Sequence, residues 1–68
     1  MVKISLAAAR KNVNLSREKV AEIMGVAMST LQNWENGTTF PKVNQAYKLS
    51  ELYNVPLDCI DFEKNFAE

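Results

Sequence analysis

Stop signals divide the chain into short helical segments, and their spacing limits the folds open to it. Glycine follows two of the segments, at Gly25 and Gly37, and asparagine follows two others, at Asn14 and Asn54. Both residue types tolerate the left-handed backbone with which helices often end. Between these positions apolar residues recur at helical spacing, and no alternating pattern of useful length predicts a strand. The sequence therefore predicts an all-α fold.

Five helices are expected. Ser5 and Ser16 can cap the first two, because a serine hydroxyl accepts a hydrogen bond from a free backbone N–H group in the first helical turn. The third helix begins three residues after Gly25, at Met28, and Pro56 suits the start of a short fifth helix. In the third helix Trp34 is assigned to the core by its spacing from Leu31. The fourth, from about Val43 to Tyr53, is expected to turn a set of apolar residues inward: Val43, Ala46, Tyr47, Leu49, Leu52 and Tyr53.

The length and composition restrict the function classes. With 68 residues the chain is expected to form a single domain, with a core from about residue 4 to 60 and a short acidic tail, 61–68. It has no histidine, one cysteine and two glycines, which leaves no disulfide, no ordinary zinc site, no histidine chemistry and no glycine-rich phosphate loop. We therefore expect no enzyme activity, no cofactor, no metal and no small-molecule substrate. Lone Cys59, the lack of a signal peptide and the lack of a membrane span predict a cytoplasmic protein.

The net charge of zero hides an uneven distribution. Residues 1–48 carry seven basic side chains against three acidic ones, a balance of +4. Residues 49–68 carry one basic side chain against five acidic ones, a balance of −4. A basic body with an acidic end is compatible with a polyanionic partner, although scattered charge on solvated surfaces explains the numbers equally well.

The second and third helical segments, 16–24 and 28–36, have the dimensions of a helix-turn-helix. Small Ala21 allows the two helices to cross closely, and Gly25 supplies the left-handed residue of the turn. The third helix would then stand clear of the body, where it could enter a DNA major groove about 12 Å wide.

At these positions the sequence resembles the lambda-repressor-like helix-turn-helix family, which includes phage Cro and repressor N-terminal domains and xenobiotic-response-element regulators. The resemblance covers residues 4 to about 60 and implies a compact five-helix domain that binds DNA as a dimer and regulates transcription. The residues that carry it are Leu15, Ser16, Val20, Ala21, Gly25, Val26, Ser29, Thr30, Leu31, Trp34, Glu35, Asn36, Gly37, Pro41, Leu49, Val55, Pro56, Leu57 and Asp58.

The resemblance places Met28, Ser29, Gln32 and Asn33 on the groove-facing side of the third helix. Their spacing puts them on one face, opposite Leu31 and Trp34. The amides of Gln32 and Asn33 can each bond to N6 and N7 of adenine. Met28, with Ala27 before it, offers an apolar surface to a thymine methyl group. The expected base contacts are Ala27, Met28, Ser29, Gln32 and Asn33. A merely solvated polar face is the plainer alternative.

Phosphate contacts are expected on both sides of that helix. Ser16 and Arg17 begin the second helix, where free N–H groups and the helix dipole favour an anion. After the third helix, the loop matches the segment with which the family grips the DNA backbone. The residues expected there are Asn36, Thr38, Thr39 and Lys42. For the charged residues, plain solvation remains an alternative.

The resemblance also implies structural contacts. Arg10 and Glu35 match an ion pair that ties the first helix to the end of the third. Two copies are expected to place their third helices in successive major grooves of a roughly palindromic operator, about 34 Å apart. Late apolar residues are the expected dimer interface: Leu57, Ile60, Phe62 and Phe66.

Three residues depart from the family pattern. Ala27 stands where a serine or threonine usually caps the recognition helix, which costs that helix about 1 kcal/mol. Lys19 stands where a capping-box glutamate is common, and Pro56 replaces a cap before the last helix.

The leading hypothesis is a non-enzymatic DNA-binding repressor that acts as a homodimer on double-stranded DNA. An antitoxin that binds a toxin protein and represses its own operon would use the same fold. A protein-interaction module without DNA binding is an alternative of another class, and the zero net charge is its best support.

Overall fold

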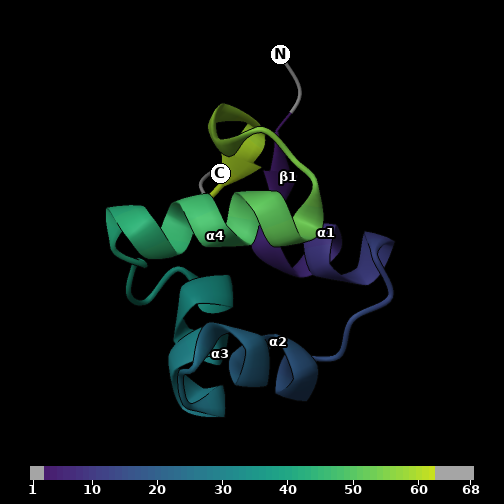
Figure 1. The fold of residues 1–68 in the computed structure, drawn as a ribbon. Coiled ribbons are helices and arrows are strands. Elements are labelled where there is room, and N and C mark those ends of the chain that lie inside the picture. Colours follow the sequence, from purple (N-terminus) through teal and green to yellow (C-terminus); the bar gives the residue numbers. More distant parts are fainter. Residues whose placement is uncertain (1–2, 63–68) are drawn as a thin grey trace.

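A computed structural model of the protein describes residues 3–62 (Figure 1). Its elements are β1 (Ile4–Ser5), α1 (Leu6–Asn12), α2 (Arg17–Met24), α3 (Met28–Asn36), α4 (Val43–Tyr53), the 3-10 turn η1 (Leu57–Cys59) and β2 (Ile60–Asp61). In Figure 1, α4 crosses the middle of the molecule, with α2 and α3 on one side of it and the strand pair on the other. The fold is therefore mostly helical, with the helix-turn-helix pair at one end.

The helices begin as the sequence predicts. The Ser5 hydroxyl oxygen accepts a hydrogen bond from the Ala8 N–H group at 3.1 Å, and that of Ser16 accepts one from the Lys19 N–H group at 3.0 Å. Ala27 occupies the capping position of α3 and supplies no side-chain hydrogen bond. The first turn of α3 therefore lacks the side-chain cap that α1 and α2 have.

The stop signals also act as predicted. Gly25 and Gly37 follow α2 and α3 with φ of 71° and 76°, and Asn54 follows α4 with φ of 58°. Asn14 has φ of 60°, two residues after α1 ends. These residue types accept the left-handed conformation that a side chain branched at Cβ would resist.

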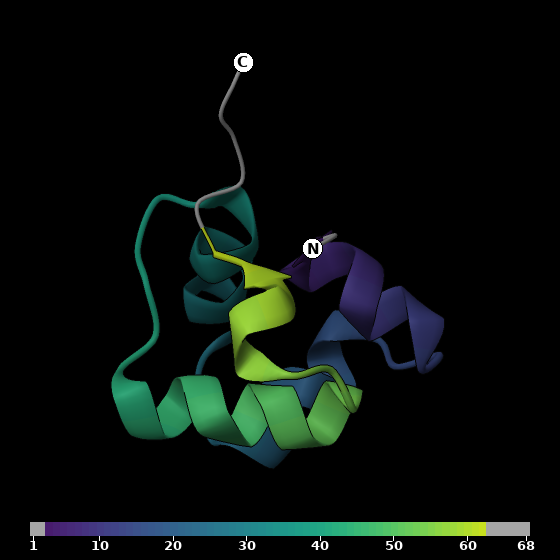
Figure 2. The same ribbon diagram turned by 90° about the horizontal axis from the view of Figure 1, so that it is seen from above.

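The expectation of five helices is wrong, and so is the expectation of no strands. The segment after Pro56 forms only the three-residue η1, after which Ile60 adopts extended backbone with φ −94° and ψ 129°. β2 then pairs in parallel with β1, with Ile4 opposite Ile60. Figure 2 shows the yellow β2 beside the purple start of the chain. Pairing with β1 holds the chain in an extended conformation just where a fifth helix would have to continue.

The core lies between α4 and the other helices. Its buried residues come from every helix and from β2: Leu6, Ala9, Val20, Ala21, Leu31, Trp34, Leu49, Tyr53 and Ile60. The assignment of Trp34 to the core is confirmed.

Two residues of α4 do not face inward as expected. Val43 is 72% exposed and Tyr47 is 58% exposed, whereas Ala46, Leu49 and Tyr53 are buried. The buried residues recur at spacings of three and four and fill the inner face of α4. Val43 and Tyr47, four residues apart, form a second apolar stripe beside it.

Two features are absent from the described part of the chain, residues 3–62. None of its helices has the length and apolar character needed to cross a membrane. Its cysteine and carboxylate side chains form no group of three or more that could hold a metal ion.

Candidate nucleic-acid interface

The outer face of α3 is open to solvent and carries three polar residues, Ser29, Gln32 and Asn33, beside the apolar Met28. Leu31 and Trp34 anchor the helix in the core, which turns the opposite face outward. All the residues expected to contact bases are exposed: Ala27, Met28, Ser29, Gln32 and Asn33. The fold therefore brings them together on one surface.

The turn between α2 and α3 is closed by backbone hydrogen bonds. The Val26 N–H group donates to the Ala21 carbonyl at 3.0 Å, and the Gly25 N–H group donates to the Glu22 carbonyl at 3.2 Å. Buried Ala21 lies on α2, which packs against α3. The direction of α3 is thus set by the backbone of the turn and by close packing.

A buried ion pair fastens the other end of α3. The Arg10 Nε atom lies 2.8 Å from Glu35 Oε2, and the two side chains are only 8% and 7% exposed. Arg10 Nη1 also donates to the Leu15 carbonyl at 3.0 Å. One guanidinium therefore holds α1, the α1–α2 loop and α3 together.

Glu35 has a second basic neighbour that sequence reasoning missed. The Nε atom of Arg17 lies 3.9 Å from Glu35 Oε1, and the Arg17 side chain is 44% exposed. Since 18 positions separate the two residues, no local spacing in the sequence could have revealed the contact. Glu35 thus lies between a buried arginine and a half-exposed one.

Tyr53 connects this ion pair with α4. Burial raises the pKa of Tyr53 to about 12; the negative charge of Glu35 acts in the same direction, and Arg10 opposes both. Within residues 3–62 its buried hydroxyl group has no hydrogen-bond partner. The hydroxyl therefore stays protonated beside the charged pair.

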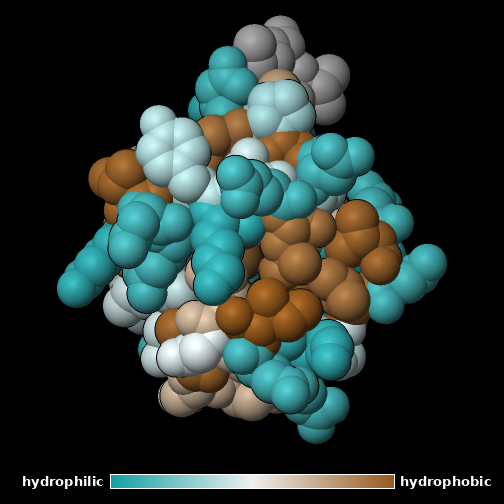
Figure 3. Space-filling model, viewed as in Figure 1, coloured by the Kyte–Doolittle hydropathy of each residue, from teal (hydrophilic) through white to brown (hydrophobic). Residues whose placement is uncertain are grey.

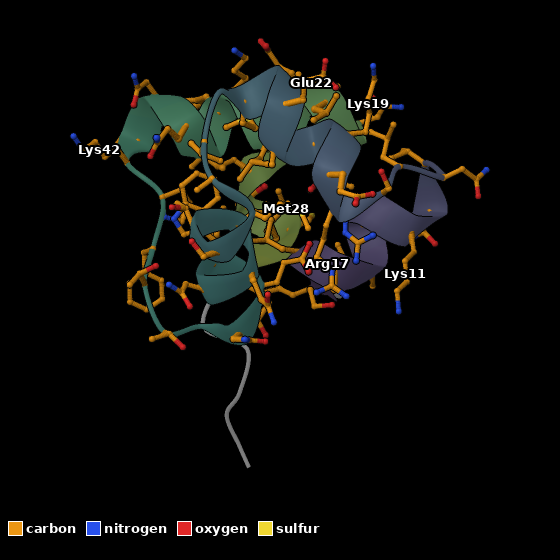
Figure 4. The ribbon with its side chains drawn as sticks, turned by 90° about the horizontal axis from the view of Figure 1, so that it is seen from below. Lys11, Arg17, Lys19, Glu22, Met28 and Lys42 are labelled. Carbon is orange, nitrogen blue, oxygen red and sulfur yellow. The ribbon has the colours of Figure 1, made fainter. Side chains whose placement is uncertain are left out.

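Basic side chains lie on both sides of α3. Figure 4 looks onto the end of the molecule formed by α2 and α3, and it shows Arg17 and Lys42 on opposite sides of α3. Lys11 and Lys19 lie on the Arg17 side in the same view. Lys19 Nζ is 3.8 Å from Glu22 Oε1, but both side chains are well exposed, so this pair is weak.

In the loop after α3, side chains are more available to a phosphate than backbone N–H groups. The N–H groups of Thr38 and Thr39 donate to the Asn33 carbonyl, at 3.0 and 3.4 Å. The side chains of Asn36, Thr38, Thr39 and Lys42 are exposed, and so is that of Ser16 at the start of α2. A phosphate at this loop would therefore meet hydroxyl, amide and ammonium groups.

The residues expected at the dimer interface do not form one surface. Ile60 is 3% exposed and pairs with Ile4, so it belongs to the core and is not available to a second copy. Leu57 is partly exposed, and Phe62 is partly buried against the core. Phe66 lies outside the described residues.

Three exposed apolar side chains were missed instead: Phe40, Val43 and Tyr47. The signal was present in the sequence, because α4 has more apolar positions than one helix face can bury.

Comparison with known proteins identifies the family. A family model described as Helix-turn-helix matches residues 6–58. The cryptic phage CTXphi transcriptional repressor RstR of Vibrio cholerae is 37% identical over an alignment of 57 residues, and the alignment covers 81% of this chain and 51% of that protein. The chain thus spans about half the length of this curated relative. No solved structure gives a significant match.

The structure has the buried Arg10–Glu35 pair and the short turn after Gly25 that the resemblance implies. Together with these features, the match over residues 6–58 shows that the chain belongs to the lambda-repressor-like helix-turn-helix family.

Proposed function

We propose that the protein is a sequence-specific regulator of transcription, a repressor of the Cro type, that binds double-stranded DNA with α3 in the major groove. The observation that carries this proposal is the surface of α3: an exposed row of polar side chains on a helix whose inner face is buried and whose end is held by an ion pair. Family membership supports the same function, and the repressor named above is a relative.

In this proposal, residues of α3 and Ala27 before it contact the bases. Gln32 and Asn33 can each present an amide to N6 and N7 of adenine, while Met28 and Ala27 can contact a thymine methyl group. Ser29 can bond to any base. We therefore propose A·T pairs in each half-site of a roughly palindromic operator.

Phosphate binding would hold α3 in its register. On one side, Ser16 and Arg17 begin α2, where the helix dipole favours an anion. On the other side, the exposed side chains of Asn36, Thr38, Thr39 and Lys42 can bind the opposite backbone. Contacts of this kind set the position of the protein and make binding depend on salt.

Binding to mixed genomic fragments across a salt series tests the proposal. The natural protein should select discrete fragments and lose affinity steeply as salt rises. The Gln32→Ala/Asn33→Ala variant should lose the selection and keep weak binding, because its phosphate contacts remain. Asn44→Ala, which removes an exposed amide from α4, is the control and should select the same fragments.

Two results would contradict the proposal. If neither protein binds DNA at low salt, the repressor function is abandoned, and a protein partner becomes the next subject of study. If half-sites selected from random DNA contain only G·C pairs at their centres, the assignment of Gln32 and Asn33 to adenine is wrong.

A further inference from the structure

An exposed apolar patch lies where the α3–α4 loop enters α4. We call Phe40, Val43 and Tyr47 the α4 patch; they are 58%, 72% and 58% exposed. Val43 and Tyr47 are four residues apart and so lie on one side of the helix. The hydrophobicity surface shows brown areas at the level of α4, separated by polar side chains (Figure 3). Three large exposed apolar side chains within eight residues indicate a contact surface.

A groove lies directly beside these side chains. It has a volume of about 240 Å³ and is lined by Phe40, Pro41, Ala46 and Phe62. Phe40 belongs to both features, and Ala46 is on the turn of α4 that carries Val43 and Tyr47. One surface therefore holds both protruding apolar side chains and an apolar hollow. Two copies related by a two-fold axis could each insert a protruding side chain into the hollow of the other, as a self-complementary interface requires.

We propose that the α4 patch is the surface through which two copies of this chain pair when both are bound to DNA. The inference rests on the proposed function, and it moves the expected dimer contact from η1 and β2 to the start of α4.

The position of the patch fits this arrangement. The loop that begins it also carries Thr38, Thr39 and Lys42, which are proposed to bind phosphate on the side of α3 away from Arg17 (Figure 4). The described chain measures 30 × 23 × 22 Å, and recognition helices in successive grooves lie roughly 34 Å apart. Two bodies of this size at that separation can touch only over a small area on their facing sides.

Without DNA the patch is large enough only for weak pairing, of about millimolar affinity. Three such side chains expose on the order of 300 Å², whereas a stable interface buries roughly 800 Å² on each partner. Exposed Lys42 and Lys48 also flank the patch, directly before Val43 and directly after Tyr47. Pairing brings these positive charges together, and neighbouring DNA phosphates would neutralise them. DNA therefore favours the pairing that the free protein resists.

The test compares the Val43→Ser/Tyr47→Ser variant with the natural protein on DNA selected by the natural protein. With two half-sites present, the second copy of the natural protein should bind at least about tenfold tighter than the first, a coupling typical of weak interfaces. The variant should lose this cooperativity and bind a single half-site with unchanged affinity. Ile23→Ser, which removes an exposed apolar side chain from α2, is the control and should keep the cooperativity. Thermal melting of all three confirms that they are folded.

A second measurement needs no DNA. In a nuclear magnetic resonance concentration series up to about 1 mM, which detects association of millimolar affinity, the signals of Val43 and Tyr47 should shift with protein concentration. Added salt should strengthen the shifts by screening Lys42 and Lys48.

The outcomes separate this inference from the proposed function. The pairing role of the α4 patch is overturned if the natural protein binds half-sites without cooperativity. It is also overturned if the Val43→Ser/Tyr47→Ser variant keeps the cooperativity. Both outcomes leave DNA binding in place. Patch signals that stay constant with concentration also overturn it, since they mean that the patch is bare or is covered by the same chain. A protein that binds no DNA but shows concentration-dependent patch signals overturns the proposed function and the role of DNA in pairing.

Discussion

Glu35 ties the end of α3 to the rest of the fold through two arginines. Its carboxylate contacts the buried Arg10 at 2.8 Å and the half-exposed Arg17 at 3.9 Å. The two contacts differ in kind, because the first is shielded from water and the second is not. The first can fix the end of α3, while the second leaves Arg17 free to turn toward a phosphate.

Glu35→Ala should lower the free energy of unfolding by about 3 kcal/mol, because it leaves the buried charge of Arg10 unpaired. Arg17→Ala should cost less than about 1 kcal/mol, since the Arg17–Glu35 contact is long and open to solvent. Urea unfolding of the two variants measures both effects. Equal losses would contradict the difference assigned to the two arginines.

The buried Tyr53 hydroxyl group should make the fold sensitive to alkaline pH. Its pKa is about 12 in the folded chain and 10.0 in the ordinary state, so the unfolded chain releases this proton first as pH rises. Below pH 10 the stability linked to this group is fully present. Between pH 10 and about 12 the free energy of unfolding falls by on the order of 3 kcal/mol.

Tyr53→Phe should remove that part of the alkaline loss. Unfolding free energies measured from pH 8 to 12 provide the test. Tyr47→Phe, at an exposed position on the same helix, should follow the natural protein. If the Tyr53→Phe variant loses as much unfolding free energy at alkaline pH as the natural protein, Tyr53 is not the cause of the loss.

Among the elements, α3 has a weakness at its start that α1 and α2 do not share. Ala27 holds the capping position with extended backbone, φ −70° and ψ 153°, the conformation in which Ser5 and Ser16 cap their helices. A serine at this position would therefore need no change of backbone to bond to the free N–H groups of α3.

Ala27→Ser should stabilise the fold by about 1 kcal/mol, and Ser16→Ala should destabilise it by a similar amount, because the one gains and the other loses a capping hydrogen bond. Thermal melting gives both values. No gain for Ala27→Ser, together with a clear loss for Ser16→Ala, would mean that the first turn of α3 is already held by its packing.

The helices could be predicted from the sequence because their signals are local. Ser5, Ser16, Gly25 and Gly37 act through hydrogen bonds and dihedral angles within a few residues of themselves, so the helix ends agree with the structure. The expected base-reading face of α3 is exposed for the same reason, since Leu31 and Trp34 determine which side is buried.

The features that sequence reasoning missed depend on distant residues. Ile60 becomes part of the core because Ile4 pairs with it, and no pattern near Ile60 reports that contact. Val43 and Tyr47 are a different case, because the sequence already shows that α4 has more apolar positions than one face can bury. Only the packed structure shows that Ala46 and Leu49 fill the inner face. The Arg17–Glu35 contact likewise depends on how two helices cross.

For the whole molecule, the proposed pairing makes a prediction about DNA geometry. The two half-sites should lie about 10 base pairs apart, centre to centre, because the two α4 patches meet only when both copies bind the same side of the duplex. Inserting about five base pairs turns one half-site to the opposite side. Binding of the second copy should then lose its cooperativity.

Titration of DNA duplexes with and without the insertion measures this effect, and a ten-base-pair insertion serves as a control for added length. Cooperativity that is unaffected by the five-base-pair insertion would show that the copies do not communicate through direct contact.

The pairing of β1 with β2 has a consequence for how the chain is made. Ile4 and Ile60 are neighbours in the structure and far apart along the chain (Figure 2). Loop closure over such a separation is slow and comes late in folding. During synthesis the helix-turn-helix pair is translated before Ile60 is added, while the N-terminal strand still waits for its partner. The surface proposed to read DNA is therefore translated before the contact that closes the core behind it can form.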